Sequence, residues 1–255
     1  MEMPAVPRGS GEHPFCLTVI TSGDLAKSQQ FYSGVFGWQM MPLTAEICAC
    51  STPAGQACAL RTGLPEGFQA VVPFIRVDDV DASVTVLVDH GFNVEKAKWS
   101  APGVGDMARL TTRSGLVVGF IKPANVDYIP TEPLPSGLGN GPKPPLSCIC
   151  SVELYSGNFG AAAQNVQSNF GWGTLETMPN YMAFDTGAGY SGIFQSHTPA
   201  IPALAYIYCD DVAAKIATIE AAGGKRMCEP MAMPGLGTFG YFNDPTGTAM
   251  GLIGP

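Results

Sequence analysis

The sequence predicts an α+β protein made of two tandem copies of one domain. Each copy contains two βαβββ units, so the chain holds four. At a shift of 134, residues 18–38 align without a gap on residues 152–172, and both stretches end in Phe-Gly-Trp. At a shift of 132, residues 78–123 align on residues 210–255, and Asp-Asp-Val and Pro-Gly-x-Gly recur in both. Repetition over this length indicates two copies of one fold, so each candidate site can be compared with its counterpart.

The helices are predicted from their caps. Asp24 is placed to cap a first helix at about 25–35, because an N-cap carboxylate accepts hydrogen bonds from the first turn. A second helix follows Asp79, and its counterpart at 212–222 ends at the Gly223-Gly224 pair, a typical helix end. Strands are predicted from alternating small and apolar residues and from the repeat, at 15–21, 46–50, 56–61, 71–77, 107–112, 116–122, 238–243 and 248–253.

Four segments are predicted along the chain. Residues 1–12 read as a flexible lead-in, and residues 13–123 and 147–255 are the two domains. Residues 124–146 between them are rich in proline and predict a semi-rigid extended linker. Because tandem copies can make internally the contact that single copies make by dimerising, we expect a monomer or a weak dimer.

Composition restricts the classes of partner. Charged residues make up only 13% of the chain and the formal net charge is −8, which argues against nucleic acid and anionic membranes as partners. No apolar run approaches the roughly 20 residues that span a bilayer. The first residues lack a charged segment followed by an apolar one, so a cytoplasmic protein is expected.

The eight cysteines contain no Cys-x-x-Cys pair. Two Cys-x-Cys pairs, Cys48/Cys50 and Cys148/Cys150, fall in strand-like runs, where alternate residues share one face. We expect buried free thiols that pack as small apolar groups, in preference to metal ligands or a disulfide.

Three stretches resemble the vicinal oxygen chelate superfamily of glyoxalase I, bleomycin-resistance proteins and extradiol dioxygenases. They are Phe31-Tyr-Ser-Gly-Val-Phe-Gly-Trp, Asp79-Val-Asp-Ala, and Asn243-Asp-Pro-Thr-Gly-Thr-Ala-Met-Gly-Leu-Ile. The tandem two-domain glyoxalase-like members are the most similar subgroup. The resemblance implies that each pair of βαβββ units folds into a cup-shaped sheet. In metal-using members, a His or Gln on the first strand of each unit and a Glu on a closing strand bind one divalent ion.

Carried over by position, the resemblance leaves no strong metal ligand. The first-strand positions become Leu17, Val72, Ser151 and Leu204, and the closing-strand positions become Gly119 and Gly251. Imidazole and carboxylate are the groups that such divalent ions prefer, and none of these residues supplies one. No metal and no cofactor are therefore predicted, with a divalent ion held by unrecognised ligands as the alternative.

Residues of the same strand parity as these positions are expected to line the cups. Copy one offers Leu17, Phe74 and Arg76, a mostly apolar set, whereas copy two offers more groups that can orient a ligand. These are Ser151, Glu153, Leu204, Tyr206 and Tyr208, together with Gly251 on the closing strand. Glu153 is the candidate catalytic acid or base; the alternative is a carboxylate paired with a neighbour or exposed to solvent.

The three histidines are expected to have structural roles. His13 lies in the segment before the first strand and is expected in an exposed tail. His90 ends a helix, where a partial positive charge suits the helix dipole. His197 follows a closing strand and is expected in a surface loop near the rim of a cup.

Two functional classes remain open. The first is a glyoxalase- or bleomycin-resistance-like protein that binds a small, partly aromatic molecule in the second cup without metal. The second is an enzyme of the superfamily, of lyase, isomerase or dioxygenase type. It would work by metal-free acid–base chemistry with Glu153 or through metal ligands not recognised in the sequence.

Overall fold

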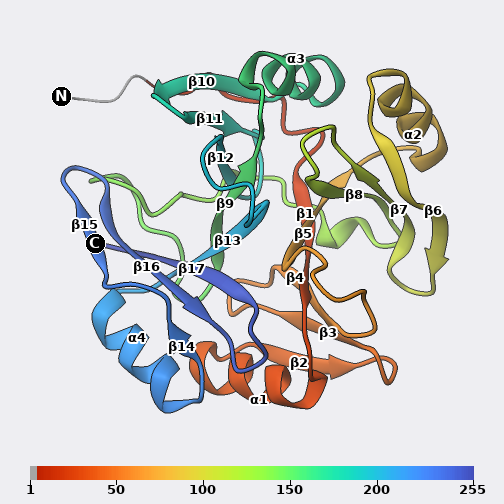
Figure 1. The fold of residues 1–255 in the computed structure, drawn as a ribbon. Coiled ribbons are helices and arrows are strands. Elements are labelled where there is room, and N and C mark those ends of the chain that lie inside the picture. Colours follow the sequence, from red (N-terminus) through yellow and green to blue (C-terminus); the bar gives the residue numbers. More distant parts are fainter. Residues whose placement is uncertain (1–4) are drawn as a thin grey trace. The chain divides into compact units, whose positions relative to one another are not determined.

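The computed structural model describes residues 5–255 and confirms the predicted α+β class (Figure 1). Within these residues, the strands belong to two mixed sheets of eight and nine strands, and four α-helices connect them. Each quarter of the chain follows the order strand, helix, further strands, which confirms four βαβββ units. In the fourth unit two short strands, β14 and β15, stand where the second unit has the single strand β6.

Contacts divide the chain into two compact units that do not follow the two copies. Unit 1 contains residues 5–17, 72–134 and 153–203, and unit 2 contains residues 18–71, 135–152 and 204–255. Each unit thus combines one βαβββ unit from each copy. Whether the predicted domains 13–123 and 147–255 fold independently stays a prediction.

Unit 1 has the strand orders β5-β8-β7-β6 and β10-β11-β12-β9. Strands β1 (Phe15–Thr21) and β9 (Ile149–Tyr155) pass from one unit to the other. The remaining elements of unit 1 are β5 (Val71–Arg76), α2 (Val80–Asp89), β6 (Asn93–Ala101), β7 (Gly105–Thr111), β8 (Val117–Pro123), the 3-10 helix η1 (Val126–Tyr128), α3 (Phe159–Phe170), β10 (Gly173–Met178), β11 (Tyr181–Asp185) and β12 (Ser191–Gln195).

Unit 2 has the strand orders β2-β3-β4-β1 and β13-β17-β16-β14, and β15 also pairs with β16. Its elements are α1 (Leu25–Phe36), β2 (Gln39–Pro42), β3 (Ile47–Ser51), β4 (Ala57–Arg61), β13 (Ala203–Tyr208), α4 (Val212–Ala221), β14 (Lys225–Arg226), β15 (Met231–Met233), β16 (Gly237–Asn243) and β17 (Ala249–Gly254). Aromatic rings from both copies meet in its core, where Phe242 of β16 lies 6.1 Å from Phe31 and 6.0 Å from Phe36 of α1.

All four helices begin at a polar N-cap. Asp24, Asp79, Asn158 and Asp211 each accept a hydrogen bond from the backbone N–H three residues on, at 2.9–3.1 Å. The caps predicted at Asp24 and Asp79 are therefore confirmed. Strands β2 and β6 were not predicted, because both lie at sheet edges and most of their residues are exposed, which removes the apolar alternation.

The segment before β1 is packed against unit 1 and is not a free tail. Ser10 N–H donates to Gly171 O at 2.9 Å, and Gly11 N–H donates to Thr186 O at 3.0 Å. His13 is half-buried, its Nδ1 lies 2.9 Å from Arg76 O, and its carbonyl accepts from Trp172 Nε1 at 2.9 Å. The expectation of a flexible lead-in ending in an exposed His13 is therefore wrong for residues 8–13, while residues 1–4 lie outside the described part of the chain.

The proline-rich connection is also attached along its length. In unit 1, Leu134 N–H donates to Gly189 O at 2.8 Å. In unit 2, Gly139 N–H donates to Leu236 O at 2.8 Å, and Lys143 Nζ donates to Gly139 O at 2.6 Å. Residues 135–143, which we call the strap, therefore belong to the fold of unit 2.

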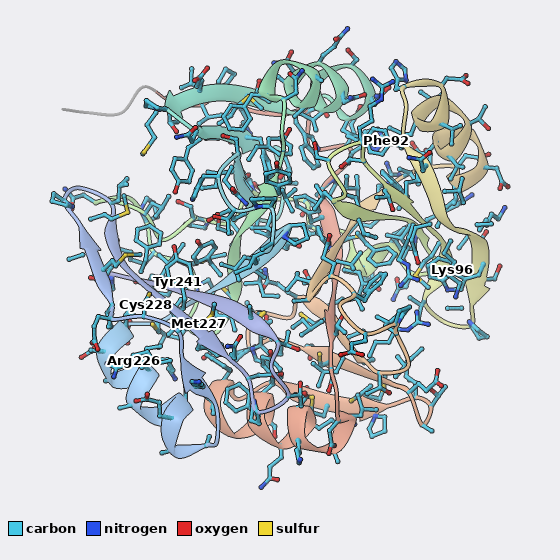
Figure 2. All side chains as sticks on the ribbon, viewed as in Figure 1. Phe92, Lys96, Arg226, Met227, Cys228 and Tyr241 are labelled. Carbon is cyan, nitrogen blue, oxygen red and sulfur yellow. The ribbon has the colours of Figure 1, made fainter. Side chains whose placement is uncertain are left out.

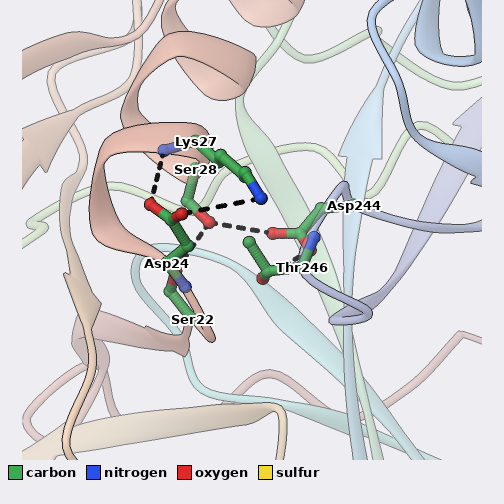
Figure 3. Close-up of polar contacts among 6 residues, drawn as sticks. All are labelled: Ser22, Asp24, Lys27, Ser28, Asp244 and Thr246. Atoms are coloured by element: carbon green, nitrogen blue, oxygen red, sulfur yellow. Dashed lines mark hydrogen bonds and ion pairs between the residues drawn. The ribbon is translucent and has the colours of Figure 1, made fainter.

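A buried polar cluster joins α1 to the β16–β17 turn within unit 2 (Figure 3). Asp244 is buried, and its carboxylate accepts from Ser28 Oγ at 3.2 Å, Thr246 N at 2.8 Å, Thr246 Oγ1 at 2.8 Å and Thr248 N at 3.0 Å. Ser28 Oγ also lies 2.8 Å from Ser22 Oγ. The Asp-Pro-Thr-Gly stretch thus has a structural role, in which one carboxylate satisfies four donors.

Seven of the eight cysteines are buried and unpaired, as predicted, and Cys228 is exposed. In the described portion of the chain, none of the helices combines the length and the apolar character required to cross a membrane.

Candidate functional site

The candidate site in unit 2 is built on three adjacent strands. Strand β13 runs parallel to β17, with Tyr206 beside Gly251, and β17 runs antiparallel to β16, with Gly251 beside Tyr241. Residues that are neighbours in register project from the same face of a sheet. Tyr206, Gly251 and Tyr241 therefore share one face, and Tyr241 is labelled on β16 in Figure 2.

The Tyr206 ring lies over the backbone of Gly251. A Cβ atom added at Gly251 would come within 2.4 Å of the ring, closer than non-bonded atoms approach, so the ring occupies the space of any side chain there. Copy one repeats this arrangement in unit 1, where a Cβ atom at Gly119 would lie 2.3 Å from the Phe74 ring. Glycine on the closing strand is thus matched by an aromatic ring on its parallel neighbour in both copies.

These two aromatic–glycine pairs bear on the divalent ion that the resemblance implies. The resemblance places a metal-binding Glu at positions 119 and 251, where glycines stand and rings fill the space. Among residues 5–255, there is no group of three or more His, Cys, Asp or Glu side chains that could hold a metal ion. The residues present at the carried-over positions therefore do not fit a divalent ion.

The rings around Tyr206 form a wall that we call the tyrosine wall, consisting of Tyr206, Phe239 and Tyr241. Tyr206 Oη donates to Tyr241 Oη at 3.1 Å, and the Phe239 ring meets the Tyr206 ring edge-on at 6.0 Å. Tyr206 is buried, and Tyr241 is half-buried. An apolar surface with two phenolic hydroxyl groups can pack an aromatic ring and orient one polar group on it.

Tyr208 continues the same face and is covered by the strap. A Cβ atom at Gly137 would lie 2.8 Å from the Tyr208 ring, and Gly137 has a φ of +80°, which glycine adopts without strain. Burial raises the pKa of Tyr208 above its ordinary value, and the negative charge of Asp210 adds to the effect. The strap thus closes one end of the face that carries Tyr206.

Unit 2 contains five of the predicted ligand-binding residues, whereas four predicted residues belong to unit 1. Those in unit 2 are Ser151, Leu204, Tyr206, Tyr208 and Gly251, and all are buried. Those in unit 1 are Glu153, Leu17, Phe74 and Arg76. The assembly of Glu153 with the tyrosines into one site therefore stays a prediction.

Glu153 has titratable neighbours of its own in unit 1. Burial raises the pKa of Tyr181, and the negative charge of Glu153 raises it further. The Tyr181 hydroxyl lies 3.2 Å from Nε2 of His197, which is exposed in the loop after β12 as predicted. The Glu153 charge thus acts on a phenol that lies beside an imidazole, and carboxylate, phenol and imidazole are all groups that can move a proton.

The copy-one face in unit 1 is more polar than the sequence suggested. Arg109 is only 4% exposed and forms two hydrogen bonds with Glu95, at 2.6 Å from Nε and 3.2 Å from an NH group. Its guanidinium carbon lies 5.8 Å from the centre of the Trp99 ring, which meets the Phe74 ring edge-on at 6.5 Å. The expectation of a mostly apolar lining is corrected here. Arg109 is the counterpart of Tyr241 at the shift of 132, and this was the signal that could have identified it.

Arg76, the predicted edge cation, is already engaged within unit 1. It forms an ion pair with Asp78, and its NH1 group donates to Glu12 O at 3.0 Å. An anionic ligand would have to displace these partners to reach Arg76.

The chain is similar in sequence to two curated proteins. No protein-family model matches it. CFP32, described as a candidate glyoxylase in Mycobacterium bovis and Mycobacterium tuberculosis, is 27% identical over 249 residues, which cover 91% of each chain.

Two solved structures share the fold. The Mn(II)-bound glyoxalase from Novosphingobium aromaticivorans aligns with a TM-score of 0.64 and 14% identity, over 94% of this chain and 81% of the other. The 2,3-dioxygenase LapB from Pseudomonas sp. KL28 aligns with a TM-score of 0.65 and 10% identity, over 100% of this chain and 94% of the other. These likenesses confirm the predicted fold.

Proposed function

We propose that this chain, which has the fold of the vicinal oxygen chelate superfamily, binds a small, partly aromatic molecule at the tyrosine wall of unit 2 without a metal ion. The observation that carries the proposal is the Tyr206 ring seated over Gly251. The resemblance implies a metal ligand at position 251, and the Tyr206 ring fills the space of that side chain. Recognition then depends on ring contacts and on the phenolic hydroxyl groups.

The wall supplies both parts of such recognition. Edge-on aromatic pairs of the kind formed by Tyr206 and Phe239 leave ring faces and edges on which a ligand ring can pack. The hydrogen bond from Tyr206 Oη to Tyr241 Oη fixes the position of two hydroxyl groups. A ligand carbonyl or hydroxyl placed against this pair would be oriented by it, as a few placed polar groups orient a ligand in a mostly apolar site.

The difference between the two copies suggests a substitution that tests the tyrosine wall. Copy one has Phe74 where copy two has Tyr206, so Tyr206→Phe converts unit 2 to the pattern of unit 1 with the ring retained. A ligand found by thermal-shift screening of aromatic carbonyl compounds should bind Tyr206→Phe roughly 10-fold more weakly, the effect of about 1.4 kcal/mol. The matched control Phe74→Leu should bind as the original protein does. Loss of binding in Phe74→Leu alone would place the ligand in unit 1 and refute the proposal.

Metal independence has its own test. Purified protein should contain no stoichiometric Fe, Mn, Ni or Zn by inductively coupled plasma mass spectrometry, and ligand affinity should be the same before and after dialysis against a chelator. Binding that disappears with the chelator and returns with one divalent ion would refute this part of the proposal.

A second candidate is an acid–base enzyme that uses Glu153, and the effect of its charge on Tyr181, which lies beside His197, favours it. In that case Glu153→Gln, which keeps the shape and removes the basic group, should abolish turnover of an identified substrate and leave its binding unchanged. Unchanged turnover in Glu153→Gln would exclude Glu153 as the acid or base.

A further inference from the structure

Unit 1 contains a cavity that belongs to neither of the faces described above. Its volume is about 200 Å³, and it is partly open to solvent. The lining includes Ile75, Val118 and Phe120. Each of these residues precedes or follows, along its own strand, a residue such as Phe74 or Gly119 that points to the opposite face of the sheet. Because neighbouring residues on a strand point to opposite faces, the cavity lies behind the sheet, on the side of helix α3.

The interior of the cavity is aromatic. The lining includes the rings of Phe92, which is labelled in Figure 2, Phe120, Tyr155, Phe170, Trp172 and Phe194. The Phe120 and Phe170 rings are stacked with centres 5.9 Å apart, and the Phe170 and Trp172 rings lie 5.6 Å apart. An apolar cavity of about 150 Å³ is large enough to take benzene, so this one has room for a single substituted ring.

The mouth of the cavity is positively polarised. Arg113, in the turn between β7 and β8, lines it, and within residues 5–255 its guanidinium makes no hydrogen bond or ion pair. The guanidinium is packed against Gly91, where a Cβ atom would come within 2.3 Å of it. Gly157 N–H donates to Ser114 Oγ at 3.1 Å, which holds this turn beside the N-terminus of α3. A helix N-terminus carries a partial positive charge that adds to that of Arg113.

A buried polar atom of the lining residue Asn165 has no hydrogen-bond partner among the described residues. Asn165 of α3 lines the cavity, and its Nδ2 donates to Ala161 O at 3.0 Å. A carbonyl accepts only from the amide nitrogen, so the orientation of Asn165 is fixed by this bond. Its Oδ1 is buried and accepts no hydrogen bond from the described residues. A buried acceptor of this kind is satisfied when a ligand brings a donor.

We propose that this cavity binds a single-ring aromatic carboxylate that carries a hydroxyl or amino donor. The ring packs among Phe120, Phe170 and Trp172, and the carboxylate lies at Arg113 and the N-terminus of α3. The donor on the ring is matched to Asn165 Oδ1. The site is distinct from the tyrosine wall, so one of the two proposals can fail without the other.

The probe for the test is 4-hydroxybenzoate, with 4-hydroxybenzyl alcohol as its uncharged analogue, in isothermal titration calorimetry on the full chain. Ala162→Leu fills the cavity from α3 and should abolish binding of both compounds. Ala163→Leu, on the same helix but outside the lining, should bind as the original protein does. Arg113→Gln should weaken binding of the acid at least 10-fold and that of the alcohol less than 2-fold. The control Arg226→Gln makes the same change in net charge elsewhere and should have no effect.

Each alternative outcome overturns the proposal. Absence of saturable binding would do so, as would equal binding in Ala162→Leu and Ala163→Leu. Binding that is lost in Tyr206→Phe but kept in Ala162→Leu would assign the probe to the tyrosine wall. The melting temperature of each variant, measured alongside, separates loss of the site from loss of the fold.

Discussion

Removal of the buried Asp244 carboxylate should strongly destabilise the β16–β17 turn. In Asp244→Ala four donors lose their acceptor: Ser28 Oγ, Thr246 N, Thr246 Oγ1 and Thr248 N. Thr246 is half-buried, so water replaces its two bonds, whereas Ser28 and Thr248 are buried. Each buried donor left unpaired costs about 1–3 kcal/mol, which gives about 2–6 kcal/mol for the pair.

The repeat supplies a matched control for this change. Thr112 occupies the position of Asp244 in copy one, and its Oγ1 accepts a single hydrogen bond, from Leu116 N at 3.2 Å. Thr112→Ala should therefore cost only about 0.5–1.5 kcal/mol. Hydrogen-exchange mass spectrometry is the assay, because it reports opening of each segment separately. The slowest amides of β16 and β17 should exchange at least roughly 30-fold faster in Asp244→Ala, which corresponds to the lower end of the estimate, about 2 kcal/mol. An Asp244→Ala variant that exchanges no faster than Thr112→Ala would refute the reasoning.

Three further predictions follow from burial. Iodoacetamide at pH 8 should modify Cys228 alone in the native protein, because the other seven cysteines are buried. Burial raises the pKa of Cys16 to about 12, so Cys16 stays an unreactive thiol at this pH. Peptide mapping that finds Cys16 modified would contradict this prediction. Gly119→Ala should destabilise the fold by about 1–3 kcal/mol through contact with the Phe74 ring, and Phe74→Leu in the same chain should recover part of the loss in urea denaturation. Arg109→Met leaves a carboxylate without its partner and should lower stability by about 2–4 kcal/mol; an unchanged urea midpoint would show that the pair contributes nothing.

Local sequence signals were sufficient for most helices and central strands. The caps at Asp24 and Asp79 act over three residues, so their geometry is encoded next to the helix that they begin. Strand parity predicted that Tyr206 and Gly251 line the same face, and the register places them side by side. These features depend on neighbours in sequence or on one strand pairing.

The sequence was less informative where long-range packing or an irregular strand decides the structure. Glu95 and Trp99 were missed because β6 is an edge strand whose pairing with β7 shifts register twice, so period two fails along it. His13 was placed in a tail because its bonds to Arg76 and Trp172 connect residues 63 and 159 positions apart. The cavity near Arg113 is equally hidden, since α3 and the β7–β8 turn come from different copies.

The composition of the compact units has a consequence for how the chain folds. Each compact unit combines one βαβββ segment from the first copy with one from the second. One copy by itself therefore contains half of the residues of each hydrophobic core. If the two copies were separate molecules, they would complete these two cores only on meeting, at a rate set by their concentration. Fusion into one polypeptide makes that encounter intramolecular, with an effective concentration of order millimolar for a connection of this kind. The single polypeptide thus keeps together two copies that carry different residues on matched strands, Phe74 and Arg109 in one and Tyr206 and Tyr241 in the other.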